Sequence, residues 1–152
     1  MSKHITYFDA SAAVKLAVEE PGSAHVRQHF QKHYRHYMTS LCFAEALGAL
    51  KGKVQRKELS LEKYFYACSL LIDHLRARRF ELEETLKISP ETFSEAEKLA
   101  KKHGLDLSDA LQLVTVRDGK FKNWGWECKT VLATADQALA KAAKEEACGL
   151  GM

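Results

Sequence analysis

The sequence predicts an α/β protein built on a small parallel sheet with helices on both faces. Short β-rich runs alternate with longer helical patterns along the chain, which is typical of parallel strands joined by helical crossovers. Helical segments outnumber the β-rich runs, so the sheet should be small and well covered. The 152 residues fit one domain of ordinary size, and 46% hydrophobic with 28% charged residues is a normal globular composition.

The first predicted elements are a strand, two helices and a second strand. Residues 4–8 are rich in β-branched and aromatic side chains, which favours a strand. A helical stretch of Ala, Val and Leu opens at Ser11, and the turn signal Pro21-Gly22 ends it. Residues 23–36 are predicted as a polar helix, and residues 37–39 as a short strand.

Two longer helices are predicted next, each opened by a capping serine. Ser40 caps the first helix, whose apolar residues recur at i, i+4, i+7 and i+11: Phe43, Leu47, Leu50 and Val54. Ser60 caps the second helix. This helix carries the clearest apolar stripe in the chain: Leu61, Tyr64, Phe65, Cys68, Leu71, Ile72 and Leu75.

The remaining part of the chain, from residue 80 onward, predicts two strands and three helices. Residues 80–88 form a strand candidate. Ser89 and Pro90 are an N-cap and an N1 proline for a helix over residues 90–102, which ends at Gly104. A further helix begins near Asp106 or Ser108. Residues 130–133 are a short buried strand, and Thr134 would cap a last helix over residues 135–146.

Acidic residues lie where predicted strands run into helices. Asp9 ends the first strand, Asp109 lies in the first turn of its helix, and Asp136 follows the last strand. Ligands of parallel α/β sheets bind beyond the carboxyl ends of the strands, so these acids are candidate site residues. Each aspartate taken singly is also explained by the helix dipole, which favours an acid there by about 0.3–1 kcal/mol.

Glu45 is less easily explained by helix stability alone. It lies between Phe43 and Leu47, beside the apolar stripe of its helix, where desolvation of a carboxylate is costly without a partner. Several carboxylates brought together repel one another, so at least one pKa should rise unless a cation is present. An all-oxygen cluster favours Mg²⁺ or Mn²⁺, and such ions can activate water and hold a phosphate during in-line displacement.

The four acids stand in four segments: YFDASAAVKL, SLCFAEALGAL, GLDLSDALQLVTV and TVLATADQALAKAA. Together these segments resemble the four signature motifs of PIN domains, in the family's order and over almost the whole chain. The closest resemblance is to the VapC-type toxins of toxin–antitoxin pairs. Each segment alone is short enough to occur by chance, whereas four in order on an α/β pattern are specific.

The resemblance implies a three-layer PIN-like fold, with a parallel central sheet between helices, as a single domain over residues 1–152. It assigns Asp9, Glu45, Asp109 and Asp136 as the catalytic and metal-binding acids, and Thr134 as a supporting hydroxyl residue. It implies an endoribonuclease that uses Mg²⁺ or Mn²⁺ to hydrolyse RNA. It also implies a homodimer and a small antitoxin protein that blocks the acidic site.

Two other functions remain open. One is a PIN-domain nuclease that processes RNA without an antitoxin. The other is a non-catalytic PIN-fold module that binds RNA or protein, although such a module has no need for four mutually repelling acids. The segment from Gly119 to Cys128 departs from the family in being longer and more aromatic. Its Trp124 and Trp126 could stack on bases, but packing in a hairpin or a protein interface is the favoured interpretation.

Cysteine use and hydropathy indicate a cytoplasmic protein. The four cysteines show no C-x-x-C spacing and are interpreted as reduced, mostly buried thiols: Cys42, Cys68, Cys128 and Cys148. The first residues lack the apolar core of a signal peptide, and no apolar run approaches the roughly 18 residues of a membrane span. We therefore expect no membrane association.

The net charge of +3 is too small to indicate a nucleic-acid partner by itself, so the placement of the basic side chains matters more. Four histidines lie along the predicted polar helix: His25, His29, His33 and His36. No acid or cysteine joins that row, so a pH-responsive basic surface is favoured over a zinc site. Two clusters at helix ends could contact phosphates or complement helix dipoles: Lys51, Lys53, Arg56 and Lys57, and Arg76, Arg78 and Arg79.

Overall fold

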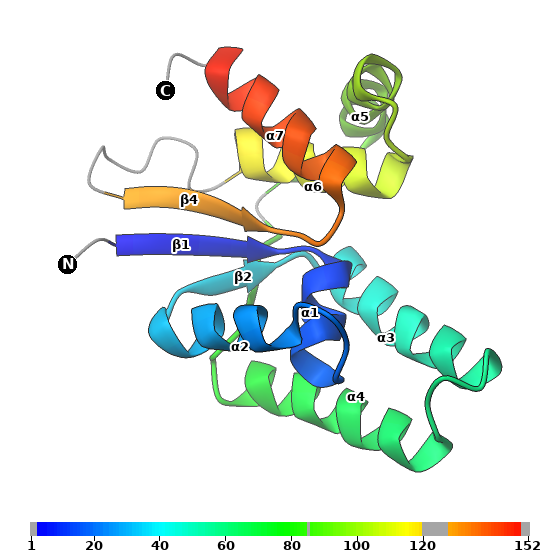
Figure 1. Ribbon diagram of the computed structural model, residues 1–152. Helices are drawn as coiled ribbons and strands as arrows, with labels where there is room; N and C mark the ends of the chain where they lie inside the picture. The colour runs from blue at the N-terminus through cyan, green and yellow to red at the C-terminus, as the bar shows by residue number, and fades with distance from the viewer. Residues whose placement is uncertain (1–2, 85, 120–127, 150–152) are drawn as a thin grey trace.

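The computed structural model describes residues 3–84, 86–119 and 128–149 (Figure 1). In chain order the elements are β1 (Lys3–Phe8), α1 (Ala10–Ala17), α2 (Ser23–Lys32), β2 (His36–Met38), α3 (Ser40–Gln55), α4 (Leu61–Arg76), β3 (Glu81–Leu82), α5 (Pro90–His103), α6 (Leu107–Asp118), β4 (Cys128–Ala133) and α7 (Gln137–Gly149).

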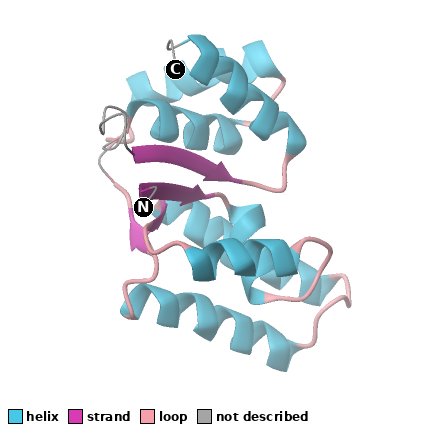
Figure 2. Cartoon of the chain, turned by 60° about the vertical axis from the view of Figure 1, so that its left-hand side comes forward, coloured by secondary structure: helices cyan, strands magenta, loops and turns pink. Residues whose placement is uncertain are grey.

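A parallel sheet of four strands forms the centre, in the order β3-β2-β1-β4. Helices α1 to α4 lie on one side of this sheet and α5, α6 and α7 on the other, as Figures 1 and 2 show. The predicted α/β class and the parallel sheet flanked by helices are therefore confirmed. β1 and β4 are neighbours over six residue pairs, which places the ends of these two strands side by side.

The two faces of the sheet bury separate hydrophobic cores. Phe8 packs with α1 to α4 in one core, which includes Phe30, Leu50 and Leu71. The other side holds a core of α5, α6 and α7, packed against Leu132 of β4. α6 is buried almost all round from residue 110 to residue 115, because it lies between the sheet and the two other helices.

Most of the predicted helix boundaries follow from capping residues. Ser60 accepts a hydrogen bond from the backbone N–H of Lys63, and Ser89 accepts one from Thr92, as expected for N-caps. Gly104 ends α5 with φ of +68°, a left-handed conformation that favours glycine. Asp106, one of the two candidate start points, caps α6 by accepting from Asp109 N.

Several boundaries differ from the prediction. α2 ends at Lys32 rather than residue 36, because the buried ring of His36 donates from Nε2 to the carbonyl oxygens near the helix end. Thr39 rather than Ser40 caps α3, by accepting from Cys42 N. β3 covers only two residues of the predicted 80–88, and β4 begins at Cys128, two residues before the predicted start.

The apolar stripe of α4 is only partly buried. Its buried residues are Ala67 and Leu71, whereas Leu61 and Phe65 are 51% and 60% exposed. α4 lies at the outside of its layer and contacts α1 and α3 along one side only. Part of the stripe therefore faces outward.

Candidate acidic site

The carboxyl ends of β1 and β4 position the first two acids. Asp9 is the first residue after β1, and its backbone N–H donates to the carbonyl oxygen of Ala133, the last residue of β4. Thr134 follows directly, and Asp136 lies two residues beyond it. The parallel pairing of the two strands thus brings residues from both ends of the chain to one edge of the sheet.

Asp9 is 4% exposed and is held by hydrogen bonds to both carboxylate oxygens. It caps α1, since its Oδ1 accepts from Ala12 N at 2.9 Å, and the same oxygen accepts from Ser11 Oγ at 2.7 Å. Its Oδ2 accepts a short hydrogen bond from the Thr134 hydroxyl. These donors fix the orientation of the carboxylate.

Asp136 rather than Thr134 caps the last helix, which corrects the predicted cap. Asp136 Oδ1 accepts from Leu139 N at 3.0 Å, in the pattern of an N-cap. Thr134 instead uses its hydroxyl twice: it accepts from Asp136 N at 3.0 Å and donates to Asp9. Thr134 therefore connects two of the acids.

Glu45 and Asp109 approach this edge from α3 and α6. Glu45 is exposed, so the expected desolvation of its carboxylate is wrong: the buried face of α3 carries Cys42, Ala46 and Leu50, and Glu45 lies off that face. Its Oε2 accepts a hydrogen bond from Ser108 Oγ at 2.7 Å, which links α3 to the start of α6. Asp109, the next residue, is half-buried.

Electrostatics show that the acids act on one another. The pKa of Asp109 is raised to about 7, by burial first and then by the negative charges of four neighbouring acids: Asp106, Asp136, Asp9 and Glu45. Burial also raises the pKa of the Cys42 thiol to about 11, helped by three of the same acids against a lowering contribution from Thr39. The four predicted site residues therefore form one electrostatic group.

The chemistry of this group suits a hard divalent cation. Its ligating atoms are all carboxylate oxygens, and an ion would relieve the repulsion that raises the pKa of Asp109. Within residues 3–84, 86–119 and 128–149, no three His, Cys, Asp or Glu side chains are arranged as a ready-made metal site. The residues that would hold such an ion are Asp9, Glu45, Asp109 and Asp136.

Two site residues are missing from the sequence-based prediction. Ser11 donates to Asp9 and accepts from Ala135 N at 2.9 Å, so it joins α1 to the segment after β4. Ser108 positions Glu45 across the site. Both serines stand within two residues of a candidate acid, and that proximity is the only signal in the sequence that could have identified them.

The histidine row does not form one helical face. His25 is exposed on α2, whereas His36 is 1% exposed on β2, and burial lowers its pKa to about 4. His29 Nε2 lies 2.8 Å from the hydroxyl oxygen of Thr6. These contacts are structural, and the described part of the chain contains no metal-binding cluster here.

Most of the basic clusters are engaged within the chain. Lys53 pairs with Glu20 at 2.8 Å, Arg56 pairs with Glu58, and Arg79 donates to the carbonyl oxygen of Phe30. These contacts favour a structural role over phosphate binding for those cations. The aromatic candidates Trp124 and Trp126 lie outside the described residues.

Comparison with protein families gives one match of broad coverage, to the PIN domain over residues 6–145. The chain belongs to the PIN-domain family. PIN domains are generally nucleases, and PIN nucleases typically use divalent metals. The protein PAE2754 from Pyrobaculum aerophilum has a similar crystal structure, with a TM-score of 0.62 over 97% of this chain and 89% of that chain. At 18% sequence identity, this likeness concerns the fold.

No curated protein sequence matches the chain. Within the described residues of this PIN domain, no helix is both long and apolar enough to cross a membrane.

Proposed function

We propose that this PIN domain is a Mg²⁺- or Mn²⁺-dependent endoribonuclease, and the toxin of a VapBC-type toxin–antitoxin pair. The observation that carries the nuclease proposal is the mutual electrostatic effect of Asp9, Glu45, Asp109 and Asp136 at the carboxyl edge of the sheet. A carboxyl group whose pKa is raised to about 7 lowers the free energy of unfolding of the metal-free protein when that group is ionised. A role in binding cations offsets this cost.

The chain's own residues would orient the reacting groups. A bound divalent cation supplies charge neutralisation and electrophilic assistance for phosphodiester hydrolysis. Thr134 and Ser11 hold the Asp9 carboxylate, and Ser108 holds Glu45, so both carboxylates are fixed before substrate arrives. In the reaction the oxygen of water bonds to phosphorus and the P–O3′ bond breaks. The departing O3′ takes up a proton and becomes a 3′-hydroxyl, the attacking water gives up a proton, and the other product is a 5′-phosphate.

The proposed partners are an RNA substrate, a small antitoxin protein and a second copy of the chain in a cytoplasmic homodimer. Outward-facing apolar side chains on α4 support a protein partner: Leu61, Phe65 and Tyr66 are 51%, 60% and 71% exposed. The acidic site would suit a basic side chain of an antitoxin, since an arginine can pair with carboxylates.

A cleavage assay tests the nuclease proposal. Fluorescent RNA is incubated with the wild type in Mn²⁺, in Mg²⁺ or in excess chelator, and with Glu45→Gln, which keeps the size and hydrogen bonding of the side chain. We expect metal-dependent cleavage by the wild type and a loss of about 100-fold or more in Glu45→Gln, with an unchanged circular dichroism spectrum.

A structural role for Glu45 would instead leave the amide variant active. Cleavage that persists in chelator would refute the metal-dependent mechanism. A folded wild type that binds RNA without cleaving any sequence would favour the non-catalytic module, and a short DNA-binding reading frame directly upstream of the gene would support the toxin over a processing nuclease.

A further inference from the structure

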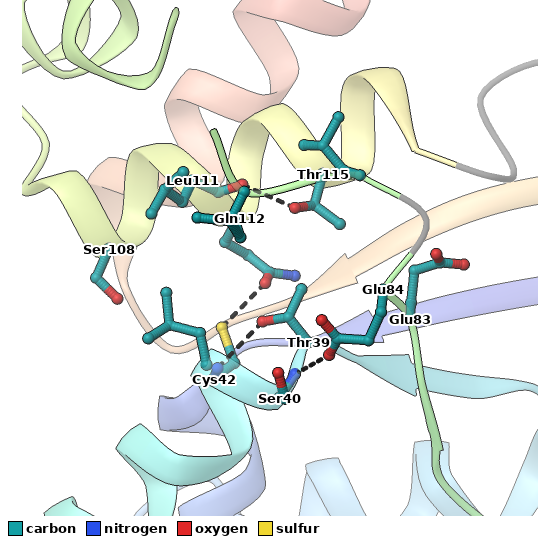
Figure 3. Close-up of a pocket in the computed structure, with 12 residues that line it drawn as sticks. Thr39, Ser40, Cys42, Glu83, Glu84, Ser108, Leu111, Gln112 and Thr115 are labelled. Carbon is teal, nitrogen blue, oxygen red and sulfur yellow. Dashed lines mark hydrogen bonds between the residues drawn. The ribbon is translucent and has the colours of Figure 1, made fainter. Parts of the chain in front are cut away.

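A pocket adjoins the acidic site on the side of β2 and β3. It lies between the start of α3, the start of α6 and the chain beyond β3 (Figure 3). The empty space between its walls is about 400 Å³, including the part open to solvent. A pocket of this shape admits the edge of a small planar group rather than a whole ligand.

The pocket contains a buried amide group with an unused donor. Gln112 on α6 is 2% exposed, and its Oε1 accepts from the Cys42 thiol at 3.0 Å. Its Nε2 has no hydrogen-bond partner among the described residues. Figure 3 shows the amide nitrogen turned away from Cys42, toward the side of the pocket where Glu84 lies. A buried N–H group without a partner is costly, so a ligand with an acceptor would be favoured here.

The Cys42 thiol fixes which end of the amide faces the pocket. Burial and the nearby acids raise the pKa of this thiol to about 11, so it is protonated at neutral pH and donates its hydrogen. A thiol donor requires the carbonyl end of the Gln112 amide. The NH₂ end is therefore left for the pocket.

An acceptor stands across from this donor. Glu84, which follows β3, is exposed and lines the pocket, and its Oε1 accepts from Ser40 N at 2.6 Å at the start of α3. That bond anchors one carboxylate oxygen, yet a carboxylate has capacity for about four hydrogen bonds. Aliphatic side chains of Leu41 and Ile88, which are 44% and 51% exposed, form part of the wall on which a flat ring could lie.

The pocket and the acidic site share their walls. Ser108 lines the pocket and donates to Glu45. Gln112 is three residues after Asp109 on α6, which is an axial rise of about 4.5 Å. A nucleotide next to the phosphate under attack would therefore have its base within reach of this pocket.

We propose that this pocket binds a nucleobase of the RNA, with guanine as the preferred base. The proposal rests on the nuclease function proposed above. Among the four RNA bases, guanine alone presents two adjacent donors, N1–H and N2–H, beside an acceptor, O6. The Glu84 carboxylate accepts from the two donors, and the Gln112 amide donates to O6.

Two alternatives fit the pocket less well. A guanidinium group carries only donors, so it would leave the Gln112 N–H unpaired and add repulsion to it. Adenine, cytosine and uracil each present a single donor position to the carboxylate. The combination of one amide donor and one carboxylate acceptor thus selects the guanine edge.

The test compares short RNAs that differ at one base. The probes are fluorescent oligouridines with a single guanosine, the same RNA with inosine in that place, and the all-uridine strand. Inosine lacks only the N2 amino group. Binding is measured by anisotropy in chelator, and cleavage positions are mapped in Mn²⁺. We expect guanosine to bind about tenfold or more tightly than inosine, and cleavage to occur beside the guanosine.

Two variants separate the pocket from the fold. Gln112→Leu removes the donor to O6 with a side chain of similar size, and should reduce the preference for the guanosine RNA over the all-uridine strand roughly 3–10-fold. Glu84→Gln retains an acceptor for Ser40 N but turns an NH₂ group toward the base, and should abolish the preference over inosine. Gln28→Leu, an exposed substitution on α2, is the matched control and should bind as the wild type does.

Equal binding of guanosine and inosine RNAs by a folded wild type would overturn the pocket proposal, whether or not the protein cleaves RNA. Cleavage without base preference would leave the nuclease proposal intact and remove only the pocket. Guanosine-dependent binding without cleavage in any metal would support the pocket and remove the nuclease proposal. Wild-type preference in both Gln112→Leu and Glu84→Gln would also overturn the assignment of these two residues.

Discussion

The raised pKa of Asp109 predicts an unusual effect of a charge-removing substitution. Ordinarily an aspartate in the first turn of a helix stabilises it, so Asp109→Asn would lose up to about 1 kcal/mol. Here the carboxylate is half-buried and surrounded by four other acids, which raise its pKa from 3.8 to about 7. We therefore expect Asp109→Asn to stabilise the metal-free protein at pH 8.

The magnitude follows from proton linkage. The folded protein holds a proton on Asp109 up to pH of about 7, whereas the unfolded chain releases it near pH 4, so stability falls as pH rises between these values. One pKa unit corresponds to about 1.4 kcal/mol, which gives an upper bound of about 4 kcal/mol. Solvent screening of a partly exposed carboxylate reduces this to about 1–3 kcal/mol.

Urea denaturation followed by circular dichroism, in excess chelator at pH 4.5, 6 and 8, measures this effect. The free energies of unfolding of wild type and Asp109→Asn should approach one another at pH 4.5 and diverge by pH 8. Asp73→Asn, an exposed carboxylate paired with Arg76, is the control and should stay within about 1 kcal/mol of wild type. Destabilisation by Asp109→Asn at pH 8 would refute the reasoning, because it would show that the helix dipole outweighs the repulsion.

Three further outcomes are expected. Millimolar Mn²⁺ should raise the melting temperature of the wild type by several degrees. The rise should be larger at pH 8 than at pH 5.5, because a proton on Asp109 competes with the ion. Asp136→Asn should weaken this response while retaining the helix cap. Ser108→Ala should lower RNA cleavage about 3–10-fold with a change in unfolding free energy below about 1 kcal/mol, whereas a purely structural serine would leave cleavage unchanged. Gly104→Ala should destabilise the fold by about 1 kcal/mol in thermal denaturation, because the φ of Gly104 is +68°. Gly48→Ala should instead stabilise the fold by about 0.5–1 kcal/mol, because Gly48 lies on α3 with open space around it. Equal effects of the two alanines would contradict the last argument.

The sequence predicted helix ends correctly where they depend only on residues close by in the chain. Capping by Ser60 and Ser89, and the left-handed end of α5 at Gly104, depend on residues within one turn. The acids at the strand ends were identifiable for a related reason. A parallel sheet brings its carboxyl ends together, so Asp9 and Asp136 had to share one edge once β1 and β4 were neighbours.

The errors concern residues whose environment depends on distant parts of the chain. His36 leaves the helical pattern because it begins β2, and its buried ring donates to the carbonyl oxygens at the end of α2. Phe65 belongs to a regular apolar stripe, yet α4 lies at the outside of its layer and leaves it 60% exposed. Periodicity identifies an apolar face but not whether another element covers it.

Glu45 was proposed as a site residue through an argument from burial that the structure overturns. Its proximity to Phe43 and Leu47 suggested burial, but the face of α3 that packs inward is centred on Cys42, Ala46 and Leu50. The carboxylate is exposed and faces α6, where Ser108 donates to it. Only the packing of α3 against its neighbours decides between these two orientations, and one turn of sequence does not contain that information.

The hydrogen bonds of the site indicate where the repulsion among the acids is concentrated. Asp9, Glu45 and Asp136 each accept at least one hydrogen bond to the carboxylate, from Ser11, Ser108 and Leu139 N respectively. Among the described residues, no donor reaches the Asp109 carboxylate, whose neighbours contribute negative charge.

A carboxylate in that position lowers its free energy by taking up a proton or a cation, and at neutral pH the two compete. The three anchored acids therefore provide a fixed frame, and we expect Asp109 to be the residue that couples pH and metal binding to the stability of the fold.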